Sequence, residues 1–131
     1  MKIYNKLSDT LEDIGTTEDN KIRMYVCGIT VYDDCHIGHA RTIVVFDILR
    51  RYLIHKGKEL VYVQNFTDVD DKIINRAKLD GKSPDEISSK YIESYFEDFF
   101  YLNVLKADFY PKATDHIIEI INAIKILKEK N

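Results

Sequence analysis

Two histidines three residues apart are the side chains in this sequence best placed to do chemistry. His36 and His39 flank Gly38 at the point where an amphipathic segment begins. Imidazole N–H groups can donate hydrogen bonds to phosphate oxygens, and the first turn of a helix adds free backbone N–H groups and the positive end of the helix dipole. A glycine there lets a ligand approach the backbone closely. The pattern predicts a site for a phosphate chain, where such donors stabilise charge developing on a transferring phosphoryl group.

The two cysteines form neither a disulfide framework nor a paired metal motif. Cys27 and Cys35 have seven residues between them and no C-x-x-C spacing. Cys27, at the end of a predicted strand, is interpreted either as a small buried apolar side chain or as a metal ligand. Cys35 is predicted to be structural. A local zinc site of both cysteines with His36 and His39 is conceivable by residue type, but it would remove the histidines from the phosphate site.

A strand, a helix and a second strand must position these residues. Alternating apolar residues predict a strand over residues 21–27, and β-rich residues predict another over 60–66. Spacings of three and four residues predict a helix over 38–56, which Gly57 would terminate. Such a unit predicts an α/β fold in which the two strands are parallel and ligands bind at their carboxyl ends.

The apolar residues of the helix predicted over 38–56 recur on two neighbouring faces. One face comprises Ala40, Val44, Asp47 or Ile48, and Arg51 or Tyr52; the other comprises Val45, Leu49 and Leu53. Before this unit, a short strand is predicted over residues 2–5, followed by a polar connection that ends near residue 20.

Three further helices are predicted over 69–79, 83–102 and 114–129. The second begins with a capping box that has proline at the first helical position; its residues are Ser83, Pro84 and Glu86. The third carries its apolar residues on one face; they are Ile117, Ile121, Ile124 and Leu127.

Several side chains admit a functional and a structural interpretation. Asp68, Asp70 and Asp71 could bind magnesium, but such a cluster more often caps a helix, and we favour Asp68 as the cap. The aromatic group in residues 91–100 is predicted to pack the helix rather than to stack nucleic-acid bases. His55 and His116 are predicted to lie on helix surfaces; the aromatic residues are Tyr91, Tyr95, Phe96, Phe99 and Phe100.

Three longer strings carry a resemblance to a known family. They are MYVCGITVYDDCHIGHART from Met24 to Thr42, YVQNFTDVDDKI from Tyr62 to Ile73, and PKATDHI from Pro111 to Ile117. The first contains the HIGH signature of class I aminoacyl-tRNA synthetases, and the three together resemble cysteinyl-tRNA synthetases over roughly residues 2–131. The resemblance implies a Rossmann-like nucleotide-binding domain with a parallel βαβ core. It also implies a ligase that activates cysteine with ATP and magnesium to cysteinyl-AMP and transfers it to tRNA(Cys).

The resemblance also implies roles for particular residues. Cys27 matches the first ligand of a zinc ion that holds the substrate thiolate, a soft ligand that Zn²⁺ prefers over a hydroxyl. His36 and His39 match the catalytic pair at the ATP phosphates. The remaining expected contacts to ATP or to the aminoacyl-adenylate are Gly28, Thr30, Gly38, Thr42, Asn65 and Thr67.

The sequence also limits what this chain is expected to do. A net charge of −3 with dispersed basic residues gives no basic stripe, so most tRNA contacts are expected outside it. The lysine-containing second signature and the other zinc ligands of the family have no counterpart. We therefore expect residues 1–131 to be the N-terminal portion of the catalytic domain of a monomeric parent, without the anticodon-binding domain and inactive alone.

Two other functions stay open beside the synthetase. One is a related ligase that joins cysteine to an amino sugar, as in mycothiol biosynthesis; the string from Cys35 to His39 favours the synthetase over it. The other is a non-catalytic nucleotide-binding module. With hydrophobic residues at 45% and charged residues at 31%, no secretory segment and no membrane span, the expected location is the cytoplasm.

Overall fold

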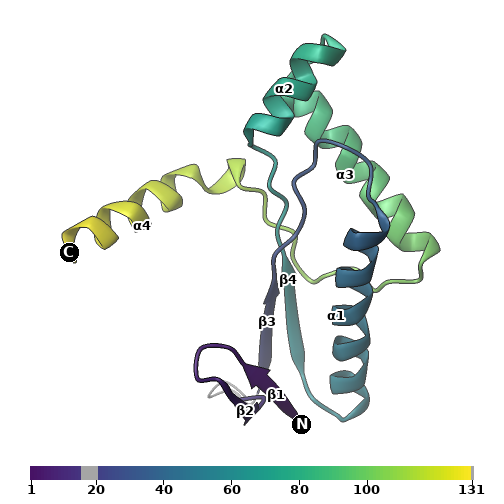
Figure 1. Ribbon diagram of the computed structural model, residues 1–131, viewed down its shortest axis with the longest axis vertical. Helices are drawn as coiled ribbons and strands as arrows, with labels where there is room; N and C mark the ends of the chain where they lie inside the picture. The colour runs from purple at the N-terminus through teal and green to yellow at the C-terminus, as the bar shows by residue number, and fades with distance from the viewer. Residues whose placement is uncertain (16–20, 131) are drawn as a thin grey trace.

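The computed structural model describes residues 1–15 and 21–130. Within them a β-hairpin precedes a two-stranded parallel sheet, one helix lies along that sheet, and two further helices pair beyond it (Figure 1). In chain order the elements are β1 (Lys2–Asn5), β2 (Thr10–Asp13), β3 (Ile22–Val26), α1 (Ile37–His55), β4 (Leu60–Gln64), α2 (Asp71–Asp80), α3 (Pro84–Tyr101), a 3₁₀ turn (Thr114–His116) and α4 (Ile117–Glu129).

The predicted strand–helix–strand unit is confirmed. β3 and β4 pair in parallel from Ile22 opposite Leu60 to Val26 opposite Gln64, with α1 as the connection between them. Gly57 follows α1 with φ of +72° and donates its N–H to the Ile54 carbonyl at 2.9 Å, as a terminating glycine does. The unit therefore brings the residues that follow β3 and β4 to one end of the sheet.

The connection predicted after α3 does more than join two helices. Residues 108–113 run parallel to β4 and its continuation, with bridges between Val63 and Phe109 and between Phe66 and Lys112. The N–H of Phe66 donates to the Pro111 carbonyl at 2.9 Å. This segment therefore acts as a short third strand, a role that the sequence did not predict.

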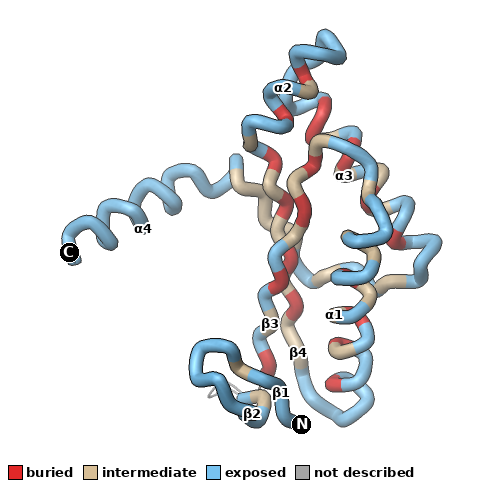
Figure 2. Tube along the Cα trace, viewed as in Figure 1, coloured by how far each residue is buried: buried red, intermediate tan, exposed pale blue. Residues whose placement is uncertain are grey.

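The core lies where α2 and α3 meet the end of the sheet (Figure 2). Phe66 is at its centre, edge-on to Tyr95 at 5.1 Å between ring centroids and stacked on Tyr110 at 5.3 Å. The aromatic group of α3 packs as predicted, although Phe100 is exposed. The buried core residues are Ile29, Val31, Ile43, Phe66, Ile73, Ala77, Ile87, Tyr91, Tyr95 and Phe99.

The predicted faces of α1 are correct in part: Asp47 and Leu53 are buried, and Ala40, Val44 and Leu49 are half-buried. Val45, Ile48 and Tyr52 are exposed, and of the predicted apolar residues Leu53 alone is buried. The face that α1 buries consists of Ile43, Asp47, Arg50 and Leu53. Two charged side chains occupy this face because each has polar partners on the segment that follows α3, as described below.

The connection predicted up to residue 20 contains a strand that the sequence analysis missed. β2 pairs antiparallel with β1, from Lys2 opposite Asp13 to Asn5 opposite Thr10. Its residues are all exposed, so there was no alternation of buried and exposed side chains to signal it. The last residues of that predicted connection, 16–20, lie outside the described part of the chain.

The prediction that Asp68 caps α2 is wrong. Asp70, not Asp68, is the N-cap: its side chain accepts the Lys72 N–H at 2.9 Å. Asp68 is buried and instead accepts hydrogen bonds from the backbone N–H of Thr114, at 3.0 Å, and from its hydroxyl. The Ser83–Glu86 capping box at the start of α3 is confirmed.

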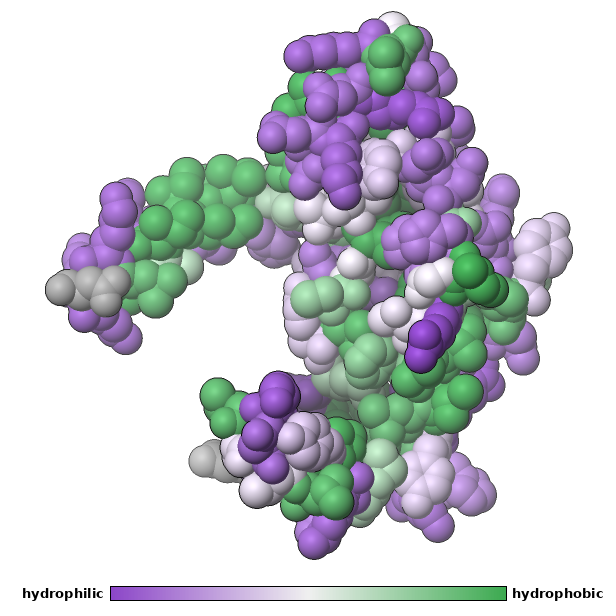
Figure 3. Space-filling model, viewed as in Figure 1, coloured by the Kyte–Doolittle hydropathy of each residue, from purple (hydrophilic) through white to green (hydrophobic). Residues whose placement is uncertain are grey.

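α4 extends away from the rest of the chain (Figure 1), and no described residue of it is buried (Figure 2). The apolar face predicted for it is therefore exposed, and Figure 3 shows hydrophobic side chains along its length. His55 and His116 are exposed, as predicted. Among the described helices, none combines the length and apolar character needed to cross a membrane.

Candidate functional site

The two histidines form a reciprocal cap at the start of α1. His36 is the N-cap residue, and its Nδ1 accepts the backbone N–H of Gly38 at 3.0 Å and that of His39 at 3.4 Å. The His39 Nδ1 accepts the backbone N–H of His36 at 3.3 Å. This is the arrangement of a capping box, in which histidines replace the usual serine and glutamate.

The cap determines which nitrogen of each ring carries a proton. An Nδ1 that accepts a hydrogen bond is unprotonated, so a neutral ring has its proton on Nε2. Burial, and secondarily the charge of His36, lower the pKa of His39, which favours this neutral form. Each histidine therefore presents one N–H donor directed away from the helix backbone, at the positive end of the α1 dipole.

Gly38 makes room for the cap. A Cβ atom at this position would lie 2.8 Å from Cε1 and 3.0 Å from Nδ1 of the His36 ring. Sequence reasoning explained this glycine by the close approach of a ligand. The geometry gives a reason within the chain: a larger residue would displace the ring that caps the helix.

Four of the predicted site residues lie together where the two parallel strands end. Gly28 donates its N–H to the side-chain oxygen of Asn65 at 2.8 Å, and a Cβ on Gly28 would lie 1.6 Å from the Asn65 carbonyl oxygen. Thr30 pairs with Thr67 in a parallel bridge. The amide of Asn65 also donates to the Thr67 hydroxyl at 3.4 Å. The strand ends thus form one polar surface of backbone and short side chains.

Thr42 lies apart from that surface. It is exposed one turn into α1, and its hydroxyl donates to the Gly38 carbonyl at 3.2 Å. The predicted residues therefore fall into two groups: a helix-start group of His36, Gly38, His39 and Thr42, and a strand-end group of Gly28, Thr30, Asn65 and Thr67.

The loop between the two groups is tied to α2 and α3. Asp33 forms an ion pair with Arg76 of α2 at 3.6 Å, and Asp34 accepts the hydroxyl hydrogen bond of Ser94 of α3 at 2.9 Å. Sequence reasoning missed all of these residues. Asp34 and Ser94 are 60 residues apart, and no local pattern links them.

A hollow of about 310 Å³ lies beside the helix-start group, lined in part by Cys35, His36 and Asp98. Cys35 is half-buried and packs against the core, in line with its predicted structural role. Burial, with smaller contributions from Asp98 and Asp34, raises the pKa of the Cys35 thiol to about 11. A thiol in this state is a poor nucleophile and a poor metal ligand at neutral pH.

The described residues supply one candidate zinc ligand rather than a zinc site. Cys27 is exposed where β3 ends. No three histidine, cysteine, aspartate or glutamate residues in the described ranges lie close enough together to hold a metal ion. A structural or catalytic Zn²⁺ needs at least three protein ligands, so Cys27 could be one member of a set but cannot hold the ion alone.

Comparison with known proteins links the chain to one group of enzymes. The family described as tRNA synthetases class I (C) catalytic domain matches residues 13–131. A cysteine–tRNA ligase of Trichormus variabilis is 54% identical over 130 residues, and one of Archaeoglobus fulgidus is 55% identical over 131 residues. Another, of Clostridioides difficile, is 52% identical over 130 residues.

These alignments cover 99% of this chain but only 27–28% of each of the three relatives. The chain therefore spans about a quarter of their length, and the family match over residues 13–131 spans the positions of both groups of candidate site residues. On this evidence, the chain belongs to the class I (C) tRNA synthetase catalytic domain family.

Proposed function

We propose that this chain provides the ATP- and cysteine-binding N-terminal portion of the catalytic domain of a cysteine–tRNA ligase, built as a Rossmann-like nucleotide-binding unit. One observation carries the proposal. The reciprocal cap of His36 and His39 leaves one N–H donor on each ring, at the start of a helix that follows the carboxyl end of a parallel strand. Phosphate groups bind at such helix ends in open α/β sheets.

The proposed reaction joins two substrates. A carboxylate oxygen of cysteine attacks the α-phosphorus of ATP, the bond from that phosphorus to the bridging oxygen breaks, and pyrophosphate leaves with Mg²⁺. His36 and His39 donate hydrogen bonds to the phosphate oxygens as charge shifts toward the pyrophosphate. The hydroxyl at the 3′ end of tRNA(Cys) then attacks the cysteinyl carbonyl, and AMP leaves.

The strand-end group is proposed to hold the adenylate. Asn65 and Thr67 present an amide and a hydroxyl there, and Gly28 and Thr30 lie beside them on the adjacent strand end. Thr42 is proposed to contribute from the first turns of α1. Cys27 is proposed as one ligand of a zinc ion that selects cysteine; since the described residues do not complete that site, we derive no step through it.

The oligomeric state, the location and the tRNA contacts of the parent enzyme are proposed from membership of the family. The parent enzyme is proposed to act as a monomer in the cytoplasm, with most tRNA contacts outside this chain. The relatives reported above are named for the tRNA ligase reaction rather than for ligation to an amino sugar, which supports the synthetase as the first choice.

Titration calorimetry of the 131-residue chain tests the proposal. The ligands are ATP with Mg²⁺ and a non-hydrolysable cysteinyl-adenylate analogue. His36→Asn keeps a good N-cap but lacks the Nε2–H donor. We expect it to weaken analogue binding about tenfold or more, the range for a hydrogen bond to a charged group.

His55→Asn is the matched control, because His55 lies exposed at the other end of the same helix. It should leave the affinity unchanged. A folded wild-type chain that binds neither ligand would overturn the proposal, as would equal losses in the two variants.

A further inference from the structure

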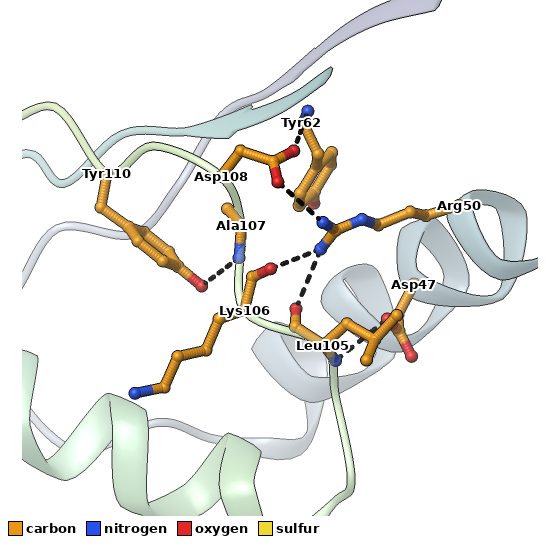
Figure 4. Close-up of polar contacts among 8 residues, drawn as sticks. All are labelled: Asp47, Arg50, Tyr62, Leu105, Lys106, Ala107, Asp108 and Tyr110. Carbon is orange, nitrogen blue, oxygen red and sulfur yellow. Dashed lines mark hydrogen bonds and ion pairs between the residues drawn. The ribbon is translucent and has the colours of Figure 1, made fainter. Parts of the chain in front are cut away.

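α1 is fastened to the segment after α3 by a set of partly buried polar contacts (Figure 4), which we call the Asp47–Arg50 clasp. The Arg50 guanidinium donates to the carbonyl oxygens of Leu105, at 3.5 Å, and Lys106, and to the Asp108 carboxylate at 3.3 Å. One oxygen of Asp47 accepts the Leu105 N–H at 3.1 Å. The clasp comprises these five residues.

The clasp also reaches β4. The second carboxylate oxygen of Asp108 accepts the backbone N–H of Tyr62 at 2.7 Å, and the Asp108 N–H donates to the Tyr62 carbonyl at 2.9 Å. The Arg50 guanidinium lies 5.3 Å from the centroid of the Tyr62 ring. A single carboxylate thus joins a side chain of α1 to the main chain of β4.

Two charged side chains of the clasp lie on the buried face of α1. Asp47 and Arg50 are each only 8% exposed, on the face that α1 turns inward. Buried ion pairs seldom add more stability than apolar residues of equal volume, but their directional bonds can select one arrangement of the elements that they join. The arrangement selected here is the orientation of α1 against β4.

That orientation matters for the two groups of the candidate site. His36 and His39 lie at the start of α1, whereas Asn65 and Thr67 directly follow β4. The loop contacts of Asp33 and Asp34 tether only the start of the helix. Arg50 lies 11 residues beyond His39, about 16 Å along the axis. The clasp therefore acts on the far half of the helix, together with the buried Leu53 and the hydrogen bond from Arg51 to the Asn103 carbonyl at 2.6 Å.

We propose that Asp47, Arg50 and Asp108 are positioning residues that hold the helix-start group at the correct distance from the strand-end group. The proposal rests on the proposed function for its consequence in ligand binding, but its geometric part can be tested without any ligand. The variants are Asp108→Asn, which removes the charge of a half-exposed member of the clasp, and Arg50→Met. Asp80→Asn, in an exposed ion pair of α2, is the control.

The first measurement is the distance between α1 and the sheet, by pulsed electron resonance. Spin labels are placed on the exposed Cys27 and on Val45→Cys, which is exposed on α1, in a Cys35→Ala background. We expect a broader or shifted distance distribution in both clasp variants and no change in Asp80→Asn. Distributions equal to the wild type in both clasp variants would overturn the proposal.

The second measurement compares two ligands by calorimetry. Inorganic tripolyphosphate can contact the helix-start group alone, whereas the cysteinyl-adenylate analogue must contact both groups. A small displacement between the groups should weaken analogue binding about tenfold while leaving tripolyphosphate binding unchanged. A merely structural role would weaken both equally, and that result would contradict the proposal. Failure of the wild type to bind the analogue would reject the proposed function, while the spin-label distances would still decide the role of the clasp.

Discussion

The imidazole rings of His36 and His39 stack, with their centroids 3.8 Å apart and their planes 14° from parallel, and each ring caps the main chain of the other residue. Ser83 and Glu86 make the corresponding contacts at the start of α3. Serine and glutamate keep their acceptor oxygens over the neutral pH range. Histidine does not, because a proton on Nδ1 removes the acceptor.

The cap of α1 should therefore weaken in acid. Because burial and the charge of His36 lower the pKa of His39, the folded chain binds this proton less readily than the unfolded chain. The stabilisation is complete above the unfolded pKa of about 6.5 and is lost as the pH falls through the lower folded pKa. A double variant, His36→Ser with His39→Gln, keeps a capping box in which neither acceptor is an imidazole.

Urea unfolding between pH 7.5 and 5 checks this prediction. The free energy of unfolding should fall more in the wild type than in the double variant, with His55→Gln behaving as the wild type. Parallel pH profiles for all three proteins would show that the histidine cap does not titrate in this way.

Gly28→Ala should destabilise the chain strongly. The added Cβ would lie 1.6 Å from the Asn65 carbonyl oxygen, so the two strand ends would have to separate. We expect a loss of about 3 kcal/mol in the free energy of unfolding, at the upper end of the usual cost of overpacking. Gly15→Ala has open space around the new Cβ and should change stability by less than about 0.5 kcal/mol. Chemical denaturation measures both, and similar values would refute the steric explanation.

The two cysteines should differ in reactivity. Cys27 is exposed, whereas burial raises the pKa of the Cys35 thiol to about 11. Relative to the unfolded chain, the alkylation of Cys35 by iodoacetamide at pH 7.5 should be slower by on the order of a hundredfold, since the thiolate is the reactive form. Peptide mapping by mass spectrometry separates the two sites. Equal protection of both cysteines would contradict the prediction.

Substitutions in α4 should have little effect on the stability of the folded chain. Ile73 of α2 is fully buried in the core, while Ile124 of α4 is exposed. Ile73→Ala is expected to cost about 2–5 kcal/mol, and Ile124→Ala less than about 0.5 kcal/mol. Denaturant titrations provide both numbers. A large effect of Ile124→Ala would mean that α4 packs against the chain in solution.

Local patterns gave the elements that local interactions determine. The apolar periodicities of β3, α1 and β4, the terminating Gly57 and the Ser83 capping box all depend on residues within a few positions of one another. The burial of Arg50 was missed because its partners lie 55 to 58 residues further along the chain. The sequence left Asp47 and Ile48 as alternatives for one position, because the Leu105 N–H that Asp47 accepts lies 58 residues away. A charged residue on an amphipathic helix is ordinarily placed in solvent unless its partner is known.

For the candidate site and its surroundings, too, the sequence predicted the features that depend on local spacing and missed those that depend on distant residues. The histidine motif placed the start of α1 correctly, since three-residue spacing alone is enough to form the cap. The choice of Asp68 as the N-cap failed because Thr114, which holds it, lies 46 residues away. Sequence could suggest two neighbouring aspartates as caps, but only the fold distinguishes the one that faces α2 from the one that faces the 3₁₀ turn.

The clasp has a consequence for the order in which the chain can fold during synthesis. Arg50 and Asp108 are 58 residues apart. At synthesis rates of about 5–20 residues per second, Asp108 is therefore added roughly 3–12 s after Arg50. Until then α1 can form its turns, and Asp47 can pair with Arg51 one turn away, but Arg50 stays hydrated and the face that carries it cannot become buried. The orientation of the helix is therefore among the last features of this chain to be fixed as it emerges from the ribosome.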